Sequence, residues 1–180
     1  CKFACKGRLS KIEDPKSRLI WVYPIEHVFI EGMIAYSMYQ SLKSRETPMH
    51  FGLGAIDRLK RNLVSTQDGY RVTTDWSGFD QHVPAWLIHM VFDALFSKVD
   101  LKRWDTPAHN SGLTYRYMQR AMKLTREYFV HTPFVMPDGH VYYKHQGVPS
   151  GSPFTQLVDT VVNMTMVRYA LTKLHVSFRH

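Results

Sequence analysis

Apolar residues return every three to four positions along much of this chain, a period typical of helices that bury one face. The longest such stretches predict helices at residues 24–43, 84–99 and 113–129. A shorter basic helix is predicted at residues 55–63, and a further apolar helix is predicted to begin near Pro153. The apolar faces of these helices are expected to supply most of the packing contacts.

Short runs of β-branched and aromatic residues predict strands between the helices. One run covers residues 19–23 and ends before Pro24, and another covers residues 72–74. Apolar arms flank Asp138-Gly139 and predict a hairpin at residues 134–143, since this dipeptide favours a tight turn. Helices and strands together indicate an α+β fold, and 180 residues of which 44% are hydrophobic suffice for a buried core.

The predicted strand at residues 72–74 leads directly to two carboxylates. Asp75 follows it, and Ser77 and Gly78 favour a turn before Asp80. A carboxylate at the end of a strand is well placed to bind a hard divalent cation, and Asp80 would face whatever that cation binds. The alternative is that both aspartates are ordinary turn and helix-cap groups.

A second polar stretch, residues 146–163, places a small-residue loop before an apolar helix. Ser152 is predicted to cap this helix, with Pro153 in its first turn. Four-residue spacing gives the helix one polar stripe, made of Thr155, Asp159 and Asn163. The loop at Ser150-Gly151 would let backbone approach a phosphate or ribose. A capped core helix after a turn is the alternative interpretation.

Basic residues gather at two further places. Lys16 and Arg18 have the spacing of side chains on one face of a strand, which suits a phosphate clamp or, alternatively, a solvated strand edge. The predicted helix at residues 113–129 interleaves tyrosines with four cations: Arg116, Arg120, Lys123 and Arg126. Charge mixed with aromatic rings suits a nucleic-acid groove, although a solvated helix gives the same pattern.

The overall charge agrees with a polyanionic partner. The formal net charge is +8 and the isoelectric point is near 9.5, values that suit nucleic acid and also an anionic membrane surface. Cys1 and Cys5 alone exclude a disulfide framework and suggest no zinc site. No apolar run approaches the roughly 20 residues that span a bilayer. A soluble, intracellular protein is therefore expected.

Three of these stretches together resemble the RNA-dependent RNA polymerases of RNA viruses. Residues 72–80 resemble the first palm motif of that family, and Ser150-Gly151 with Thr155 resembles the second. Residues 16–24 resemble the basic fingers motif that covers the phosphates of the incoming nucleotide. The resemblance is strongest to the partitivirus-like, double-stranded-RNA group and covers roughly residues 11–175.

The sequence departs from the family pattern in two ways. Many plus-strand virus polymerases have Asn one turn after the Thr, whereas here Asp159 follows at that point and Asn163 a turn later. Either residue is thus a candidate to orient the ribose. The Gly-Asp-Asp turn of the palm is absent before His180, and the first residue is Cys1, so an internal fragment is expected.

The resemblance implies a partial right-hand polymerase fold of fingers and palm. Its palm sheet, with packed helices, would be truncated before the Gly-Asp-Asp strand-turn-strand. The implied parts are a fingers portion, a palm portion with the first catalytic motif, a fingers insertion with the hairpin, and a palm portion with the loop-helix motif. They cover residues 1–69, 70–100, 101–145 and 146–180, respectively.

The resemblance also implies residue roles. Asp75 and Asp80 would be catalytic, with Asp75 a ligand of a two-magnesium site that is incomplete in the fragment; Mn²⁺ is an alternative metal. Asp80 would recognise the ribose, and Lys16 and Arg18 would neutralise the triphosphate. The residues implied in nucleotide binding are Lys16, Arg18, Asp80, Ser150, Gly151, Thr155, Asp159 and Asn163.

The implied function is RNA-directed RNA polymerisation, the transfer of ribonucleotides to an RNA 3′-hydroxyl in viral genome replication and transcription. Expected partners are RNA template and product and ribonucleoside triphosphates, with a capsid protein also allowed and no membrane insertion. The expected location is the host cytoplasm, within the virion or a replication complex. The fragment alone is expected to be inactive.

Two other functions compete with this one. A non-catalytic RNA-binding module with the same basic surface is the alternative from another class. A reverse transcriptase is disfavoured, because an acid at position 80 suits hydrogen bonding to a 2′-hydroxyl.

Overall fold

The computed structural model describes residues 1–7, 17–43, 56–57, 60–61, 74–101, 112–136 and 138–176. Lys16 and residues 72–73 lie outside the described residues, and only the backbone of Arg18 is described. Residues 43–54 and 100–112, which the sequence predicts to be loops, also lie mostly outside them.

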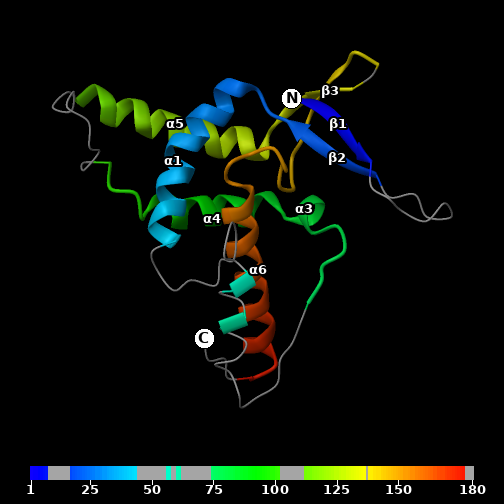
Figure 1. The fold of residues 1–180 in the computed structure, drawn as a ribbon, viewed down its shortest axis with the longest axis vertical. Coiled ribbons are helices and arrows are strands. Elements are labelled where there is room, and N and C mark those ends of the chain that lie inside the picture. The colour runs from blue at the N-terminus through cyan, green and yellow to red at the C-terminus, as the bar shows by residue number, and fades with distance from the viewer. Residues whose placement is uncertain are drawn as a thin grey trace.

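Helices dominate the described part of the chain, as the apolar periodicity predicts (Figure 1). The bounds are α1 Ile25–Lys43, α3 Phe79–His82, α4 Ala85–Phe96, α5 Gly112–Val130 and α6 Thr155–Lys173. The three long predicted helices are thereby confirmed within a few residues at each end. Of the short predicted helix at residues 55–63, residues 56–57 and 60–61 are described, and they are helical.

The strands form two small antiparallel sheets. They are β1 Lys2–Gly7 paired with β2 Ser17–Val22, and β3 Pro133–Val135 paired with β4 Val141–Tyr143. The second pair is the predicted hairpin, and Gly139 in its turn has φ 84°. Edge-to-face rings join the two sheets, because the ring of Phe134 on β3 lies 4.9 Å from that of Phe3 and 5.4 Å from that of Trp21.

The strand predicted at residues 72–74 is not seen in its described part. Thr74 and Asp75 lie in a segment without regular structure, and neither described sheet includes them. In the described residues, Asp75 therefore reaches the cleft described below from a segment without regular structure.

The core lies where α1, α4, α5 and the start of α6 meet. In α4 the buried residues are Leu87, Ile88, Val91 and Phe92, the spacing of one helix face. The ring of Phe92 lies 5.0 Å from that of Phe129 on α5 and 5.3 Å from that of Phe154, and all three are fully buried. Each such side chain contributes roughly 1.5–3 kcal/mol by leaving water.

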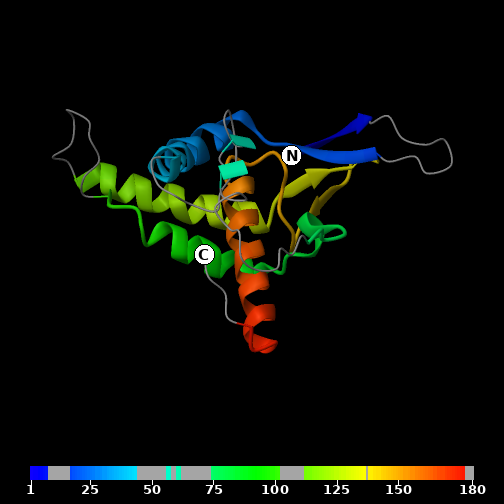
Figure 2. The ribbon, with the colours of Figure 1, turned by 60° about the horizontal axis from the view of Figure 1, so that its bottom comes forward.

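Helix α6 changes character along its length. Its first turns are buried through Leu157, Val158 and Val162, whereas its last turns stand clear of the other helices in both views (Figures 1 and 2). Exposed Tyr169 belongs to this outer half. None of the described helices is both long enough and apolar enough to cross a membrane.

Candidate active site

The two polar stretches singled out in the sequence face each other across one cleft of about 450 Å³. One wall is the segment with Asp75, Trp76 and Phe79, and the other is the face of α6 with Asp159 and Asn163. The Trp76 indole Nε1 donates a hydrogen bond to Asn163 Oδ1 at 2.8 Å across the cleft. Residues 87 positions apart are thus joined by a direct side-chain bond.

Backbone bonds at Gly147 explain why these stretches meet. The Gly147 N–H donates to the Val83 carbonyl at 2.8 Å, and the Val148 N–H donates to the Asp80 carbonyl at 2.6 Å. Gly147 has φ 81°, and a Cβ there would lie 2.6 Å from the Asp80 oxygen. Only glycine fits both the left-handed backbone and this close approach. We call this pair of hydrogen bonds the Gly147 clasp.

The two predicted catalytic aspartates differ in setting. Asp75 is exposed and lines the cleft. Asp80 lies in the single turn of α3, which begins after Gly78 at φ 62°. Its backbone is fixed by the clasp, and its side chain is exposed. The Ser77-Gly78 turn expected between the two acids is therefore confirmed.

Asp159 is the least solvated acid of the cleft. Burial and, to a lesser extent, the negative charge of Asp80 raise the pKa of Asp159 to about 7. Its Oδ1 atom is buried without a hydrogen-bond partner among the described residues. An acid in this state presents both acceptor and donor character near neutral pH to a ligand in the cleft.

The start of α6 differs from the prediction. The helix begins at Thr155, so Pro153 precedes its first turn and Ser152 is not its N-cap. The Ser152 hydroxyl instead accepts the Phe154 N–H at 3.0 Å within a preceding turn. The Thr155 hydroxyl donates to the carbonyls of Pro149 and Ser152 at 2.6 and 2.8 Å, which holds the loop together. Of the predicted stripe, Asp159 and Asn163 line the cleft.

The Ser150-Gly151 loop packs against strand β2. A Cβ on Gly151 would lie 2.0 Å from the Trp21 carbonyl oxygen, and the Trp21 N–H donates to Ser150 Oγ at 3.4 Å. The close backbone approach expected at Gly151 is therefore made to the chain itself. It also places the loop beside the strand that carries Arg18.

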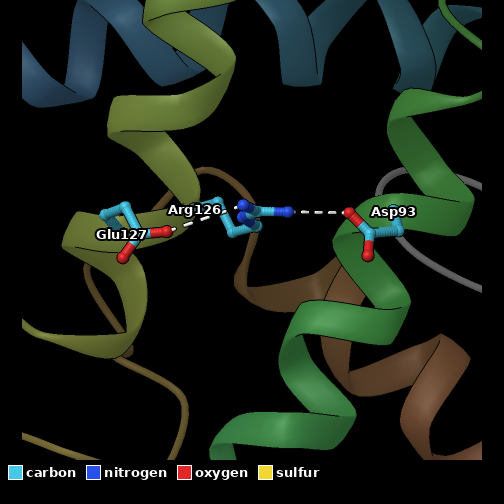
Figure 3. A network of polar contacts seen from close by, with 3 residues as sticks. All are labelled: Asp93, Arg126 and Glu127. Atoms are coloured by element: carbon cyan, nitrogen blue, oxygen red, sulfur yellow. Dashed lines mark hydrogen bonds and ion pairs between the residues drawn. The ribbon is translucent and has the colours of Figure 1, made fainter.

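The basic residues of α5 divide into two groups. Arg116, Arg120 and Lys123 are exposed on the helix. The Arg126 guanidinium instead donates to Asp93 on α4 at 2.8 Å and lies 3.6 Å from Glu127 (Figure 3). Arg126 thus fastens α5 to α4, a role that helical spacing alone could not separate from the other three.

Two buried charged residues escaped the sequence prediction. Glu31 on α1 is fully buried and accepts a hydrogen bond from Ser152, and burial raises its pKa to about 7. Burial lowers the pKa of Lys144 to about 7, and its amine donates to the Gly147 carbonyl. The sequence did carry a signal for Glu31, because Ile34 and Ala35 follow at three- and four-residue spacing on the buried face.

The described carboxylates supply only part of a metal site. Asp75 is an exposed oxygen donor in a cleft, which suits a hard divalent cation. Among the described residues, however, no group of three or more His, Cys, Asp or Glu side chains lies close enough to hold a metal ion. Within the described residues, Asp75 therefore fits the role of a single ligand.

A helical core with an acid-lined cleft and an adjoining small-residue loop suits proteins that handle nucleotides. The family model for viral RNA-dependent RNA polymerases matches residues 1–179, and the chain belongs to that family. The sequence resemblance to the partitivirus-like group is confirmed by the curated relatives described next, which come from double-stranded-RNA viruses.

Two curated relatives are RNA-directed RNA polymerases. That of Cryptosporidium parvum virus 1 (strain KSU-1) is 31% identical over 177 residues, which cover 94% of this chain and 30% of the relative. That of White clover cryptic virus 1 is 28% identical over 187 residues, with the same two coverages. The chain thus spans about 30% of the length of these relatives.

The fold is shared with a solved structure. The crystal structure of an insertion loop deletion mutant of the RNA-dependent RNA polymerase of a human picorbirnavirus has a TM-score of 0.72. It is 20% identical, and the match covers 97% of this chain and 32% of that one. The partial α+β polymerase fold expected from the sequence is confirmed by this likeness.

Proposed function

We propose that this chain is part of an RNA-directed RNA polymerase that adds ribonucleotides to an RNA 3′-hydroxyl. The observation that carries the proposal is the cleft, where Asp75 meets Asp159 and Asn163 of α6. Membership of the viral polymerase family supports it. The fingers and palm portions implied by the resemblance are part of the same proposal.

The proposed roles follow from position. Asp80 and either Asp159 or Asn163 bind the ribose 2′-hydroxyl, since acids and amides accept or donate hydrogen bonds to it. In this proposal the Ser150-Gly151 loop contacts the nucleotide, and Thr155 holds that loop from within. Lys16 and Arg18 neutralise the triphosphate in this proposal.

The proposed metal is Mg²⁺, with Mn²⁺ as the alternative. Asp75 is one ligand, and the remaining carboxylates come from outside the described residues. When bound, such ions stabilise negative charge on transferring phosphates. Template and product RNA are proposed to contact the exposed cations of α5. The host cytoplasm, within a virion or replication complex, is the proposed location, with a capsid protein as a further partner.

The test is the Asp75→Asn substitution in a longer polymerase that contains this sequence and has the length of the curated relatives. Losing a metal-binding carboxylate removes transition-state stabilisation, so incorporation should fall by roughly a thousandfold. The control is Asp57→Asn, which changes an exposed acid that is not among the residues lining the cleft. Activity of the Asp75 variant within about tenfold of the parent would contradict the proposed role.

The same assay separates the alternative function. A non-catalytic RNA-binding module would bind RNA in a salt-dependent way without metal-dependent incorporation by the parent protein. The observation that supports this alternative is the set of exposed cations on α5.

A further inference from the structure

Glu31 is buried in the core without a cationic partner among the described side chains. Its exposed fraction is 0%, and no ion pair in the described part of the chain includes it. Tyr23, His27 and Tyr128 lie around it and supply no permanent positive charge. Burying an acid without a cationic partner lowers the stability of the fold. Acids whose pKa is shifted by burial concentrate near functional sites.

The one hydrogen bond that the structure gives this carboxyl reaches the loop of the second polar stretch. Ser152 Oγ donates to Glu31 Oε2 across 121 residues of sequence. The same hydroxyl accepts the Phe154 N–H at 3.0 Å, and the Ser152 carbonyl accepts the Thr155 N–H at 3.1 Å. Ser152 therefore links α1 to the turn that starts α6.

The opposite side of the loop is fixed by β2. Gly151 packs on the Trp21 carbonyl, and Ser150 accepts the Trp21 N–H. Strand β2 ends at Val22 and α1 begins at Ile25, so these two elements hold the loop from both sides as one continuous segment.

We infer that Glu31 is a positioning residue for nucleotide binding, acting through Ser152 to hold the Ser150-Gly151 loop in place. It touches no substrate in this arrangement. The inference rests on the proposed function for its kinetic consequence, whereas its structural consequence can be measured without catalysis.

The structural test is hydrogen exchange at the Phe154 and Thr155 amides in the polymerase of the relatives' length. Glu31→Ala removes the acceptor of the Ser152 hydroxyl, so these amides should exchange about tenfold faster. Glu31→Gln keeps an acceptor of the same shape and should stay within about threefold of the parent. The matched control is Glu26→Ala, which removes an exposed acid from the same helix and should change neither amide.

The kinetic test separates positioning from general stability. Because the loop is proposed to contact the bound nucleotide, Glu31→Ala should raise the nucleotide KM about tenfold while kcat changes by less than about threefold. Ser152→Ala should reproduce this split, and the double variant should add little to the change in KM, since both changes break the bond between Glu31 and Ser152. Should Glu31→Ala fail to fold, Ser152→Ala carries the kinetic test from the loop side. Exchange is then read at the Thr155 amide alone, because Ser152→Ala also removes the acceptor of the Phe154 N–H.

Two outcomes would overturn the inference. One is unchanged exchange and unchanged KM in Glu31→Ala and Ser152→Ala. The other is a Glu31→Gln variant as impaired as Glu31→Ala, which would mean that charge rather than the hydrogen bond matters. A parent that incorporates no nucleotide contradicts the proposed function instead, and the exchange data still decide the role of Glu31.

Discussion

The Asp159 carboxyl shows how its surroundings change what an acid can do. Its pKa of about 7 means that it is largely protonated below neutrality and becomes charged above it. The protonated form donates a hydrogen bond, as the amide of asparagine does. An aspartate at this place can therefore present a donor to the cleft, although many plus-strand virus polymerases use asparagine there.

In the proposed function, sugar selection depends on Asp159 and its neighbour Asp80. If Asp80 recognises the 2′-hydroxyl, Asp80→Ala should cost ribonucleotides more than deoxyribonucleotides. One hydrogen bond to a charged group contributes about 1.5–3 kcal/mol, so the preference should fall by roughly ten- to a hundredfold. The ratio of kcat/KM for the two nucleotides measures it.

The control for this measurement is Asp57→Ala, since Asp57 is also an exposed aspartate on a helical segment. It should leave the ratio as in the parent. An unchanged ratio in Asp80→Ala as well would remove Asp80 from ribose recognition.

The side chains of α5 show which of its cations are available for the proposed binding of RNA. Arg116, Arg120 and Lys123 recur at four- and three-residue spacing and are exposed, whereas Arg126 pairs with Asp93. Three exposed cations on one face of a helix can each displace a counterion from an RNA backbone. Arg126 is expected to contribute to stability rather than to RNA affinity.

Replacing Arg116, Arg120 and Lys123 together by Gln should lower the salt dependence of RNA binding. Each lost phosphate contact reduces the slope of log K against log salt by about 0.7–0.9, so the total change should be roughly two. Binding titrations over a range of salt concentrations provide the slope. Arg126→Gln is the comparison, and a slope change there equal to one third of the triple effect would show that it binds RNA too.

Sequence patterns predicted elements well and contacts between them poorly. The apolar spacing of Leu87, Val91 and Leu95 defined α4 because burial of one helix face depends only on local order. The partners of Gly147 were not predictable, because a glycine signals a tight backbone without naming what approaches it. For the same reason the direction of the Thr155 hydroxyl emerged only from the folded loop.

Buried charge was the other feature that sequence reasoning missed. Glu31 and Lys144 look like ordinary surface residues by type, since isolated acids and lysines are almost always exposed. Their hydrogen-bond partners in the fold are Ser152 for the buried Glu31 and the Gly147 carbonyl for the partly buried Lys144, and residue type alone does not name these partners. By contrast, local helical spacing correctly placed Arg116, Arg120 and Lys123 on one exposed face of α5.

The Gly147 clasp connects two halves of the molecule that are far apart in sequence. Its hydrogen bonds join the α3 turn to the loop before α6, and so fix the cleft from the side of the backbone. The Asp80 and Val83 carbonyls would otherwise lack these partners. The clasp is therefore expected to contribute to global stability as well as to the site.

Gly147→Ala should lower the free energy of unfolding by about 2–4 kcal/mol. The new Cβ would be strained by the left-handed backbone and would also clash with the Asp80 carbonyl oxygen. Gly139→Ala is the matched control: its φ is 84°, close to the 81° of Gly147, but a Cβ there meets nothing within 4 Å. That change should cost only about 1–2 kcal/mol. Denaturant unfolding measures both, and equal losses would show that the clasp does not resist a side chain.

The Gly147 clasp also couples two contacts that the polymerase is proposed to make with each nucleotide. In the proposed function, Asp80 senses the sugar while the Ser150-Gly151 loop contacts the same nucleotide, and the clasp makes their backbones neighbours in one hydrogen-bonded unit. A substrate that fits badly at one contact would then disturb the other. The accuracy of copying would then depend on the clasp as much as on either contact. Error rates should therefore change when Gly147 is substituted, even though its side chain is a single hydrogen atom.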